Sequence, residues 1–289
     1  MSSIILETKD LSHIYLKGTT SQVDAIRDVC LKIEKGELVG VIGHTGSGKS
    51  TLIQHFNGLL KGSSGTVLLD GTDIWANKSQ LRNVRFRVGI CFQYPEHQLF
   101  EETVYKDVSF GPKNMMIDDS EIDLRVREAI KYVGLDEGYY NKSPFDLSGG
   151  EKRRVAIAGV MAMKPDVLIL DEPCAGLDPK GRETILSLIK NYRETTGSTV
   201  LVVSHSMEDI SKLATKVLVM NNSRLAYYGT VEEVFSHASE LREMGLNIPH
   251  ITELFLRLKE KGYNVRTDIY TLEKAKEEIL KLLKGGKKD

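Results

Sequence analysis

One loop constrains this chain more than any other segment, because it joins a short apolar strand to a helix through closely spaced glycines. Residues 37–42 are mostly apolar and bounded by glycine, as a buried parallel strand should be, and residues 50–56 carry apolar side chains at helical spacing. The pattern G-x-x-x-x-G-K-[ST] in this context predicts a phosphate-binding loop. The loop itself is Gly43-His44-Thr45-Gly46-Ser47-Gly48-Lys49-Ser50.

The loop also predicts how a nucleoside triphosphate would be held. Glycine easily reaches the backbone angles that turn N–H groups toward phosphates, and a helix beginning at about Lys49 adds its positive N-terminal end. Lys49 should reach the β- and γ-phosphates, and the Ser50 hydroxyl should bind Mg²⁺. The expected nucleotide-binding residues here are Gly43, His44, Thr45, Gly46, Ser47, Gly48, Lys49, Ser50 and Thr51.

A second apolar run, residues 167–170, ends in the two carboxylates Asp171 and Glu172. In phosphate-loop enzymes a strand-end aspartate holds the metal ion, usually through water, so Asp171 is expected in that role. Successive strand residues point to opposite sides, so Glu172 would face the cleft differently and could deprotonate the attacking water. Paired acids at a strand end fit a solvated turn equally well on their own. The phosphate loop upstream favours the catalytic interpretation.

Two further strands are expected to end in polar side chains. Residues 199–203 lead into Ser204 and His205, and residues 88–92 lead into Gln93. Ligands bind at the carboxyl edge of open α/β sheets, which makes His205 a candidate contact for the γ-phosphate. Tyr15 is expected in a loop after the N-terminal strand, where its ring could stack on adenine. On pattern alone, an exposed or packing tyrosine is an equal alternative.

A five-residue motif at 147–151, about a hundred residues beyond the loop, indicates which class of phosphate-loop protein this is. With the other motifs, and in the same order, it resembles the nucleotide-binding domain of ABC transporters from about residue 4 to 236. The resemblance places Tyr15 at the adenine-stacking loop, Gln93 at the Q-loop and His205 at the switch histidine. The remaining motifs are Walker A at 43–50, the signature Leu147-Ser148-Gly149-Gly150-Glu151, Walker B at 167–172 and the D-loop at 175–178.

This resemblance implies an α/β phosphate-loop NTPase (RecA-like) core that binds ATP and Mg²⁺ and works as one of a pair. Ser148, Gly149 and Gly150 would open a helix over 151–163 and cap the nucleotide held by the other subunit, since a helix N-terminus is an anion site. Gln93 and Asp171 would position metal and water, and Glu172 would take the proton.

Two residues depart from the commonest family pattern. Glu151 ends the signature where glutamine is more usual, and its carboxylate could weaken nucleotide binding or slow turnover at the site that this loop completes. The favoured interpretation is a first-turn acid that stabilises its helix. Cys174 precedes the D-loop where threonine or serine is commoner, and it could make the site sensitive to thiol reagents.

Residues 94–112 and 143–147 resemble the second of the two ATPases of energy-coupling factor transporters, which import vitamins and transition-metal ions. In that family the first segment forms a short helix and groove that receive coupling helices of the transmembrane partner. Apolar residues beside acids suit a basic partner helix, although a solvated acidic loop is the alternative without the resemblance. The apolar residues are Leu99, Phe100 and Val104, and the acids are Glu96, Glu101 and Glu102.

The expected function is therefore an ATP-hydrolysing motor that powers micronutrient import from the cytoplasmic side of the cell membrane. Its expected partners are a second, different ATPase, a transmembrane coupling subunit and a small substrate-binding membrane subunit. The alternatives are the motor of another type of ABC transporter and a soluble ABC ATPase acting on nucleic acid or ribosomes. A net charge of −1, from 39 basic and 40 acidic residues, predicts no broad nucleic-acid surface.

The expected layout has three parts: an α/β core over 1–95 and 165–236, a helical subdomain over 96–164, and a short C-terminal helical extension over 237–289. No signal peptide is expected at the N-terminus, and the lysine-rich tail 281–289 is expected to be solvated. Two helical faces in the extension would either contribute to pairing or pack on their own domain. Their residues are Ile251, Leu254, Phe255 and Leu258, and Leu272, Ala275, Ile279 and Leu282.

Overall fold

The structure, a computed structural model, describes residues 3–284. Within that range a six-stranded sheet forms the centre of the molecule, in the order β10-β9-β3-β8-β7-β6. Neighbours from β9 to β6 are parallel, and β10 is antiparallel to β9. β3 and β8 are buried throughout, as expected for parallel strands covered on both faces. The strands are β3 Leu38–Ile42, β6 Val88–Cys91, β7 Val167–Asp171, β8 Thr199–Val203, β9 Lys216–Asn221 and β10 Arg224–Thr230.

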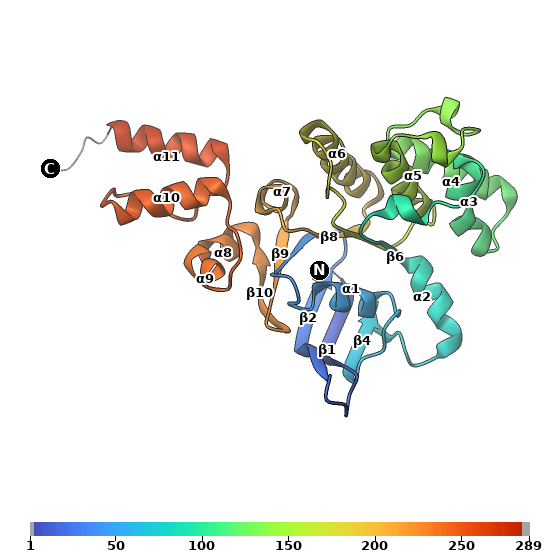
Figure 1. Cartoon of the computed structure of the whole chain (residues 1–289), viewed down its shortest axis with the longest axis horizontal. Helices are drawn as coiled ribbons and strands as arrows, with labels where there is room; N and C mark the ends of the chain where they lie inside the picture. The colour runs from blue at the N-terminus through green and yellow to red at the C-terminus, as the bar shows by residue number, and fades with distance from the viewer. Residues whose placement is uncertain (1–2, 285–289) are drawn as a thin grey trace.

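A smaller antiparallel sheet lies beside the core, in the order β2-β1-β4-β5 among the described residues. Helix α1 (Lys49–Phe56) packs against both sheets (Figure 1), because its buried Leu52, Ile53 and Phe56 share one hydrophobic cluster with side chains of β2, β3 and β4. This two-sided packing fixes the helix that follows the phosphate loop. The strands are β1 Ile4–Tyr15, β2 Val23–Glu34, β4 Ser64–Leu69 and β5 Thr72–Asp73.

Three helices pack together beyond the β6 edge of the core, at the right of Figure 1. They are α3 (Val104–Asn114), α4 (Asp119–Tyr132) and α5 (Gly149–Met161). Within residues 3–284 no helix combines the length and apolar character that a membrane span requires. The other helices of this part are α2 Leu81–Arg87, α6 Pro179–Thr196 and α7 Met207–Leu213, and the 3₁₀ turns are η1 Lys78–Gln80, η2 Pro95–Gln98, η3 Glu137–Tyr139 and η4 Pro144–Asp146.

The C-terminal part ends in a helical hairpin that projects from the body at the left of Figure 1. Helices α8 (Val231–Ser236) and α9 (Ala238–Glu243) belong to the main core, whereas α10 (His250–Glu260) and α11 (Leu272–Lys284) form a small cluster of their own. Two residues predicted on the packed faces, Leu254 and Leu272, are instead exposed. Leu272 is the first residue of α11, where the two helices do not cover it. The predicted residues that do pack in this cluster are Ile251, Phe255, Leu258, Ala275, Ile279 and Leu282.

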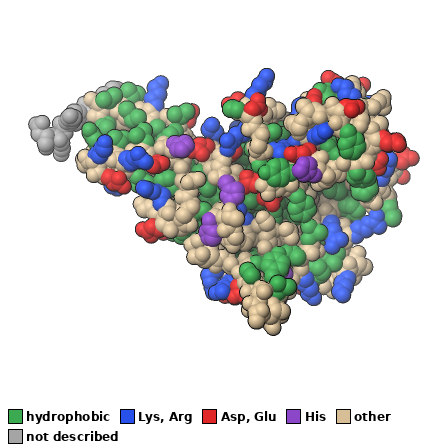
Figure 2. Space-filling model, in the orientation of Figure 1, with side chains coloured by type: hydrophobic (Ala, Val, Ile, Leu, Met, Phe, Trp, Pro, Cys, Tyr) green, Lys and Arg blue, Asp and Glu red, His purple; other side chains and the backbone are tan. Residues whose placement is uncertain are grey.

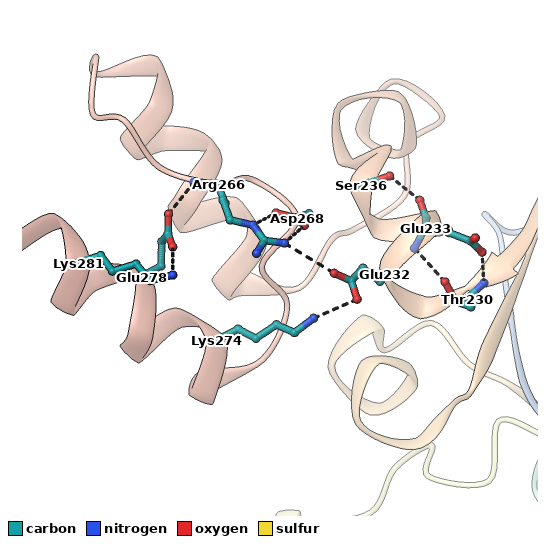
Figure 3. A network of polar contacts seen from close by, with 9 residues as sticks. All are labelled: Thr230, Glu232, Glu233, Ser236, Arg266, Asp268, Lys274, Glu278 and Lys281. Carbon is teal, nitrogen blue, oxygen red and sulfur yellow. Dashed lines mark hydrogen bonds and ion pairs between the residues drawn. The ribbon is translucent and has the colours of Figure 1, made fainter.

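Charged side chains attach this hairpin to α8 (Figure 3). Glu232 on α8 pairs with Lys274 at 3.2 Å and with Arg266 at 3.7 Å, and Arg266 also pairs with Asp268. Each such exposed pair stabilises by only about 0–1 kcal/mol, so the attachment should weaken as salt increases. The end of the predicted lysine-rich tail, 285–289, lies outside the described residues.

Candidate nucleotide-binding site

The phosphate loop joins β3 to α1, and α1 begins at Lys49 as predicted. Gly46 and Gly48 adopt left-handed backbone angles, with φ of 81° and 103°. A Cβ on Gly48 would overlap the carbonyl oxygen of Ala25 on β2, so the close approach of β2 requires glycine there. The smaller sheet therefore shapes the loop from one side.

The loop contains buried polar groups that its own residues satisfy only in part. The Lys49 ammonium donates hydrogen bonds to the carbonyl oxygens of Gly43 (2.7 Å) and His44 (3.0 Å). The Ser47 hydroxyl is buried and, among the described residues, has no hydrogen-bond partner. An unpaired buried hydroxyl costs about 1–3 kcal/mol, which a phosphate oxygen would relieve. The loop thus fits an oxygen-rich anion.

Asp171 and Glu172 follow directly on β7, and Lys49 influences both carboxyl groups. Glu172 has a left-handed φ of 50°, and its N–H donates to the carbonyl of Val203 on β8 (3.0 Å). The chain turns at Glu172 instead of continuing as a strand, so this turn, and not strand alternation as predicted, separates the two side chains. Burial, with Asp171 nearby, raises the pKa of Glu172 to about 7. Glu172 can therefore take up or release a proton near neutral pH.

His205 lies two residues beyond the end of β8, next to Glu172. Its Nε2 is 3.5 Å from Oε1 of Glu172, and that oxygen has no hydrogen-bond partner within residues 3–284. Burial and the charge of Lys49 lower the pKa of His205, so its imidazole is neutral at pH 7. A neutral ring can donate one hydrogen bond to an incoming oxygen.

Tyr15 lies beside α1, but on a strand rather than in the predicted loop. Tyr15 is the last residue of β1 and pairs with Val23, so its prediction in a loop was wrong. Its half-exposed ring packs edge-on against His13, and its hydroxyl lies 3.4 Å from the Thr51 hydroxyl. Gln93 follows β6 by two residues and is exposed. Both side chains are accessible to a ligand.

The signature residues lie elsewhere, in a cavity of about 380 Å³ between the start of α5 and α6. Ser148 caps α5, which begins at Gly149, two residues earlier than predicted, because both glycines belong to the helix itself. Glu151 completes a capping box: its Oε2 accepts hydrogen bonds from the N–H (2.9 Å) and hydroxyl (2.6 Å) of Ser148. The hydroxyl of Tyr139 donates to its Oε1 at 2.6 Å. The helix-stabilising interpretation of Glu151 is therefore confirmed.

Part of the segment after Gln93 lies in the core rather than on the surface predicted to contact a partner helix. Leu99 and Val104 are buried core residues, and Glu96 forms an ion pair with Arg153 at 2.8 Å. Phe100 remains exposed. Leu99, Val104 and Glu96 were therefore wrongly assigned to the contact surface, because alternation of apolar and acidic residues does not reveal a partner 57 positions away.

Arg153 is a site residue that the sequence reasoning missed. It is a charged residue on the buried face of α5, and besides Glu96 it donates to the carbonyl oxygen of Pro173 (3.3 Å), just beyond Walker B. A buried charge must be paired, but Arg153 stands in the charged run 151–154, and nothing in the sequence marks it as the buried member. Arg153 thus joins the segment after Gln93 to the residues after Glu172.

Cys174 is a free cysteine whose surroundings disfavour its thiolate. The side chain is half-buried, and burial together with the charge of Asp209 raises its pKa to about 12. The thiolate is the reactive form, so the raised pKa favours slow reaction of Cys174 with thiol reagents, and the thiol sensitivity of the site stays a prediction.

Comparisons with known proteins identify the family. The "ABC transporter" family matches residues 26–175. The "Energy-coupling factor transporter ATP-binding protein EcfA2" of Clostridioides difficile (strain 630) is 54% identical over 279 residues, which cover 96% of this chain and 97% of that protein. The chain belongs to the ATP-binding proteins of energy-coupling factor transporters. A member of the same name from Clostridium perfringens (strain 13 / Type A) is 50% identical over 282 residues, which cover 97% of this chain and 99% of that protein.

Two solved structures of ATP-binding cassettes and ABC transporter subunits are similar in fold to this chain. One is cbiO1 from Clostridium perfringens, described as part of the ABC transporter complex cbiONQ, with a TM-score of 0.75, 40% identity, and coverage of 87% of this chain and 98% of that chain. Another is the ATP-binding cassette MJ0796, a dimer in a post-hydrolysis state bound to ADP and Pi. Its TM-score is 0.70 at 28% identity, and the match covers 78% of this chain and 98% of that chain. The predicted α/β fold class and the ATPase assignment are confirmed.

Proposed function

We propose that this chain is the ATP-hydrolysing motor of an energy-coupling factor importer, which powers uptake of a vitamin or another micronutrient. The observation that carries the proposal is the meeting of the phosphate loop with three side chains from strand ends. Lys49 lies close enough to influence Asp171, Glu172 and His205. The names of the relatives support the transport role.

Each residue has a part in the proposed hydrolysis. The loop amides and Lys49 bind the phosphates of ATP, and Tyr15 stacks on the adenine. Glu172 accepts the proton of the attacking water, since its pKa of about 7 suits a base near neutral pH. His205 donates a hydrogen bond to the γ-phosphate.

The oxygen donors near the loop suit Mg²⁺, which prefers hard ligands. Ser50 lies close enough to Asp171 for its hydroxyl to counter the rise in the pKa of that carboxyl. No three His, Cys, Asp or Glu side chains in the described part of the chain could hold a metal ion together. The proposed protein ligands, beside the phosphates, are Ser50, Gln93 and Asp171, since Ser50 and Asp171 already lie within hydrogen-bonding reach of each other. Mg²⁺ would supply charge neutralisation of the phosphate oxygens.

The proposed motor is a pair, because Ser148 lines a cavity with D-loop residues rather than with Lys49. In the pair, Ser148, Gly149 and Gly150 of this chain cap the nucleotide of a second, different ATPase, and the signature of that subunit caps the ATP on Lys49. This arrangement accounts for a phosphate loop and a signature at separate places in one chain.

The proposed membrane partners are a transmembrane coupling subunit and a small substrate-binding subunit, with this chain attached at the cytoplasmic side of the cell membrane. The exposed rings of Phe100 and Phe110, in edge-to-face contact at 5.0 Å, offer an apolar contact for a coupling helix. Glu101 lies beside Phe100 and would attract a basic partner. Figure 2 shows acidic and basic side chains interspersed on one face of the molecule, a pattern that gives no support to a nucleic-acid partner.

Co-purification from native membranes tests this proposal. The chain, tagged at its N-terminus, is extracted in mild detergent, and the proteins recovered with it are identified by mass spectrometry. We expect a second ABC ATPase and two unrelated membrane proteins. One of these should be the substrate-binding subunit, whose identity would indicate the substrate. A partner with fused membrane domains would indicate another type of ABC transporter. Recovery of ribosomes or nucleic acid with a soluble dimer would rule out the transport role and leave the ATPase activity standing.

A further inference from the structure

Two capping boxes occur within residues 3–284, and they differ in how firmly the capping acid is held. At the start of α8, the Thr230 N–H donates to Glu233 (2.7 Å) and the Glu233 N–H donates to the Thr230 hydroxyl (3.2 Å) (Figure 3). At the start of α5, Ser148 and Glu151 make the same two bonds, and two more donors reach the carboxylate. These are the hydroxyl groups of Ser148 and Tyr139.

The extra bonds determine where the proton of the Ser148 hydroxyl lies. Its oxygen is 2.6 Å from Oε2 of Glu151, a separation that requires a proton between the two oxygens. The hydrogen bonds from Ser148 and Tyr139 keep Glu151 ionised, because they lower its pKa to about 2 against the opposing effect of burial. The proton on this bond therefore belongs to the hydroxyl. A serine has one such proton, so while it bonds Glu151 it cannot be donated to a phosphate.

Tyr139 keeps the acid in this position. Its hydroxyl binds Oε1 at 2.6 Å, and the Lys142 ammonium lies 4.0 Å from the centre of its ring. The 3₁₀ turn that contains Tyr139 is itself capped by Asp136, which accepts the N–H of Gly138 at 2.8 Å. Glu151 thus has both oxygens engaged and cannot turn away from Ser148 without losing charge-assisted hydrogen bonds.

We propose that Glu151 is a positioning residue that restrains the signature: it holds the Ser148 hydroxyl away from the nucleotide of the paired subunit. The composite ATP site completed by this signature is then the slower of the two. Its slow step includes turning the hydroxyl from a carboxylate to a phosphate, beside a negative charge that repels the phosphate. The inference rests on the pairing stated under the proposed function.

The test is a double-mutant cycle on the intact assembly, with ATP turnover and the KM for ATP measured for the wild type, Glu151→Gln, Ser148→Ala and the double variant. Glutamine keeps the shape of the side chain and removes its charge. We expect Glu151→Gln to raise kcat about twofold and to lower KM, and Ser148→Ala to lower kcat in both backgrounds but about twofold more in the Gln background. Equal losses from Ser148→Ala in both backgrounds, or a fall in kcat with Glu151→Gln, would overturn the proposal.

Two further variants separate positioning from simple helix capping. Glu233→Gln removes the same charge from the other capping box, and we expect unchanged kcat and KM. Tyr139→Phe releases one oxygen of Glu151 without touching Ser148, and we expect a smaller rise in kcat in the same direction as Glu151→Gln. A rise in kcat with Glu233→Gln equal to that with Glu151→Gln would contradict a specific role for Glu151.

A measurement on the isolated chain does not depend on pairing. The side-chain carboxyl carbon of Glu151 is followed by NMR as the pH is lowered, and we expect the group to remain ionised at about pH 3.5, below the ordinary range for glutamate. Titration at the ordinary value would show that the bonds to Ser148 and Tyr139 are absent and would end the proposal. An assembly with no turnover in the wild type would instead count against the proposed function.

Discussion

Around Lys49 the chain leaves polar atoms without partners, whereas around Ser148 it has already paired the polar groups that a nucleotide would need. The Ser47 hydroxyl and one oxygen of Glu172 have no hydrogen-bond partner among the described residues. Ser148, Glu151 and Tyr139 are joined by short hydrogen bonds to one another. The difference shows that the phosphate loop is prepared for its ligand, while the signature must give up internal bonds before it can bind one.

The largest expected effect tests the catalytic role of Glu172, which lies in the region around Lys49. Glu172→Gln keeps the shape of the side chain but cannot accept a proton, so we expect steady-state hydrolysis to fall by about a thousandfold. ATP affinity, measured by calorimetry on the same protein, should stay within a few-fold of the wild type. Undiminished turnover would remove Glu172 from the mechanism.

Lys49→Ala should weaken ATP binding by about a hundredfold, because its ammonium is the cation nearest the expected phosphates. Equilibrium binding of ATP to the isolated chain measures this loss. Lys190, an exposed lysine on α6, provides the control, and Lys190→Ala should bind ATP normally. Normal ATP affinity in Lys49→Ala would contradict the contrast between the region around Lys49 and the region around Ser148. The phosphate loop would then not be prepared to bind a nucleotide.

The pKa of Glu172 predicts an intermediate effect of pH on hydrolysis. A base must be ionised, so kcat/KM should fall by roughly fivefold to tenfold as pH drops from about 7 to 6. The profile of kcat/KM against pH for the wild-type assembly measures this. A flat profile between pH 6 and 8 would show that another group acts as the base.

The same shift has a definite sign for stability. The folded-state pKa of Glu172 lies above its ordinary value, so its stabilising contribution is complete at low pH and is lost as pH rises through about 7. Glu172→Gln has no charge to bury, so its melting temperature should exceed that of the wild type by about 4 °C at pH 8. At pH 4 the two proteins should melt together, and a difference that persists there would point to altered packing.

The smallest effect compares the two serines directly. Ser148→Ala removes a helix cap and should lower the free energy of unfolding by about 1 kcal/mol. Ser47→Ala removes a buried hydroxyl that has no partner in the described part of the chain, so stability without nucleotide should stay level or rise slightly. Chemical denaturation of both variants gives the two values. Equal losses of unfolding free energy in the two variants would contradict the distinction between the phosphate loop and the signature.

The phosphate loop and the strand-end acids could be predicted because each is specified by neighbouring residues. Gly48 must be glycine where β2 approaches, and the apolar runs of β3 and β7 determine which side chains reach the sheet edge. The α/β fold class was predictable for the same reason, since buried parallel strands are recorded as continuous apolar segments.

What could not be predicted depends on contacts between distant residues. The pairing of Glu96 with Arg153 turns a segment that reads as a charged surface into part of the core. The Tyr139 clamp on Glu151 joins a 3₁₀ turn to a helix start, and no pattern in either segment indicates it. Tyr15 was misplaced because β1 continues to pair with β2 as far as Tyr15, opposite Val23.

The hairpin of α10 and α11 behaves mechanically as a lever. Its apolar contacts are mostly internal, and ion pairs to Glu232 attach it to α8. A body attached in this way turns with its support rather than deforming, as in hinge motions. With α11 about 20 Å long, a tilt of about 10° at α8 would move its far end by ~3 Å. A small rotation beneath the hairpin would thus be displayed at its tip as a displacement large enough to make or break a contact.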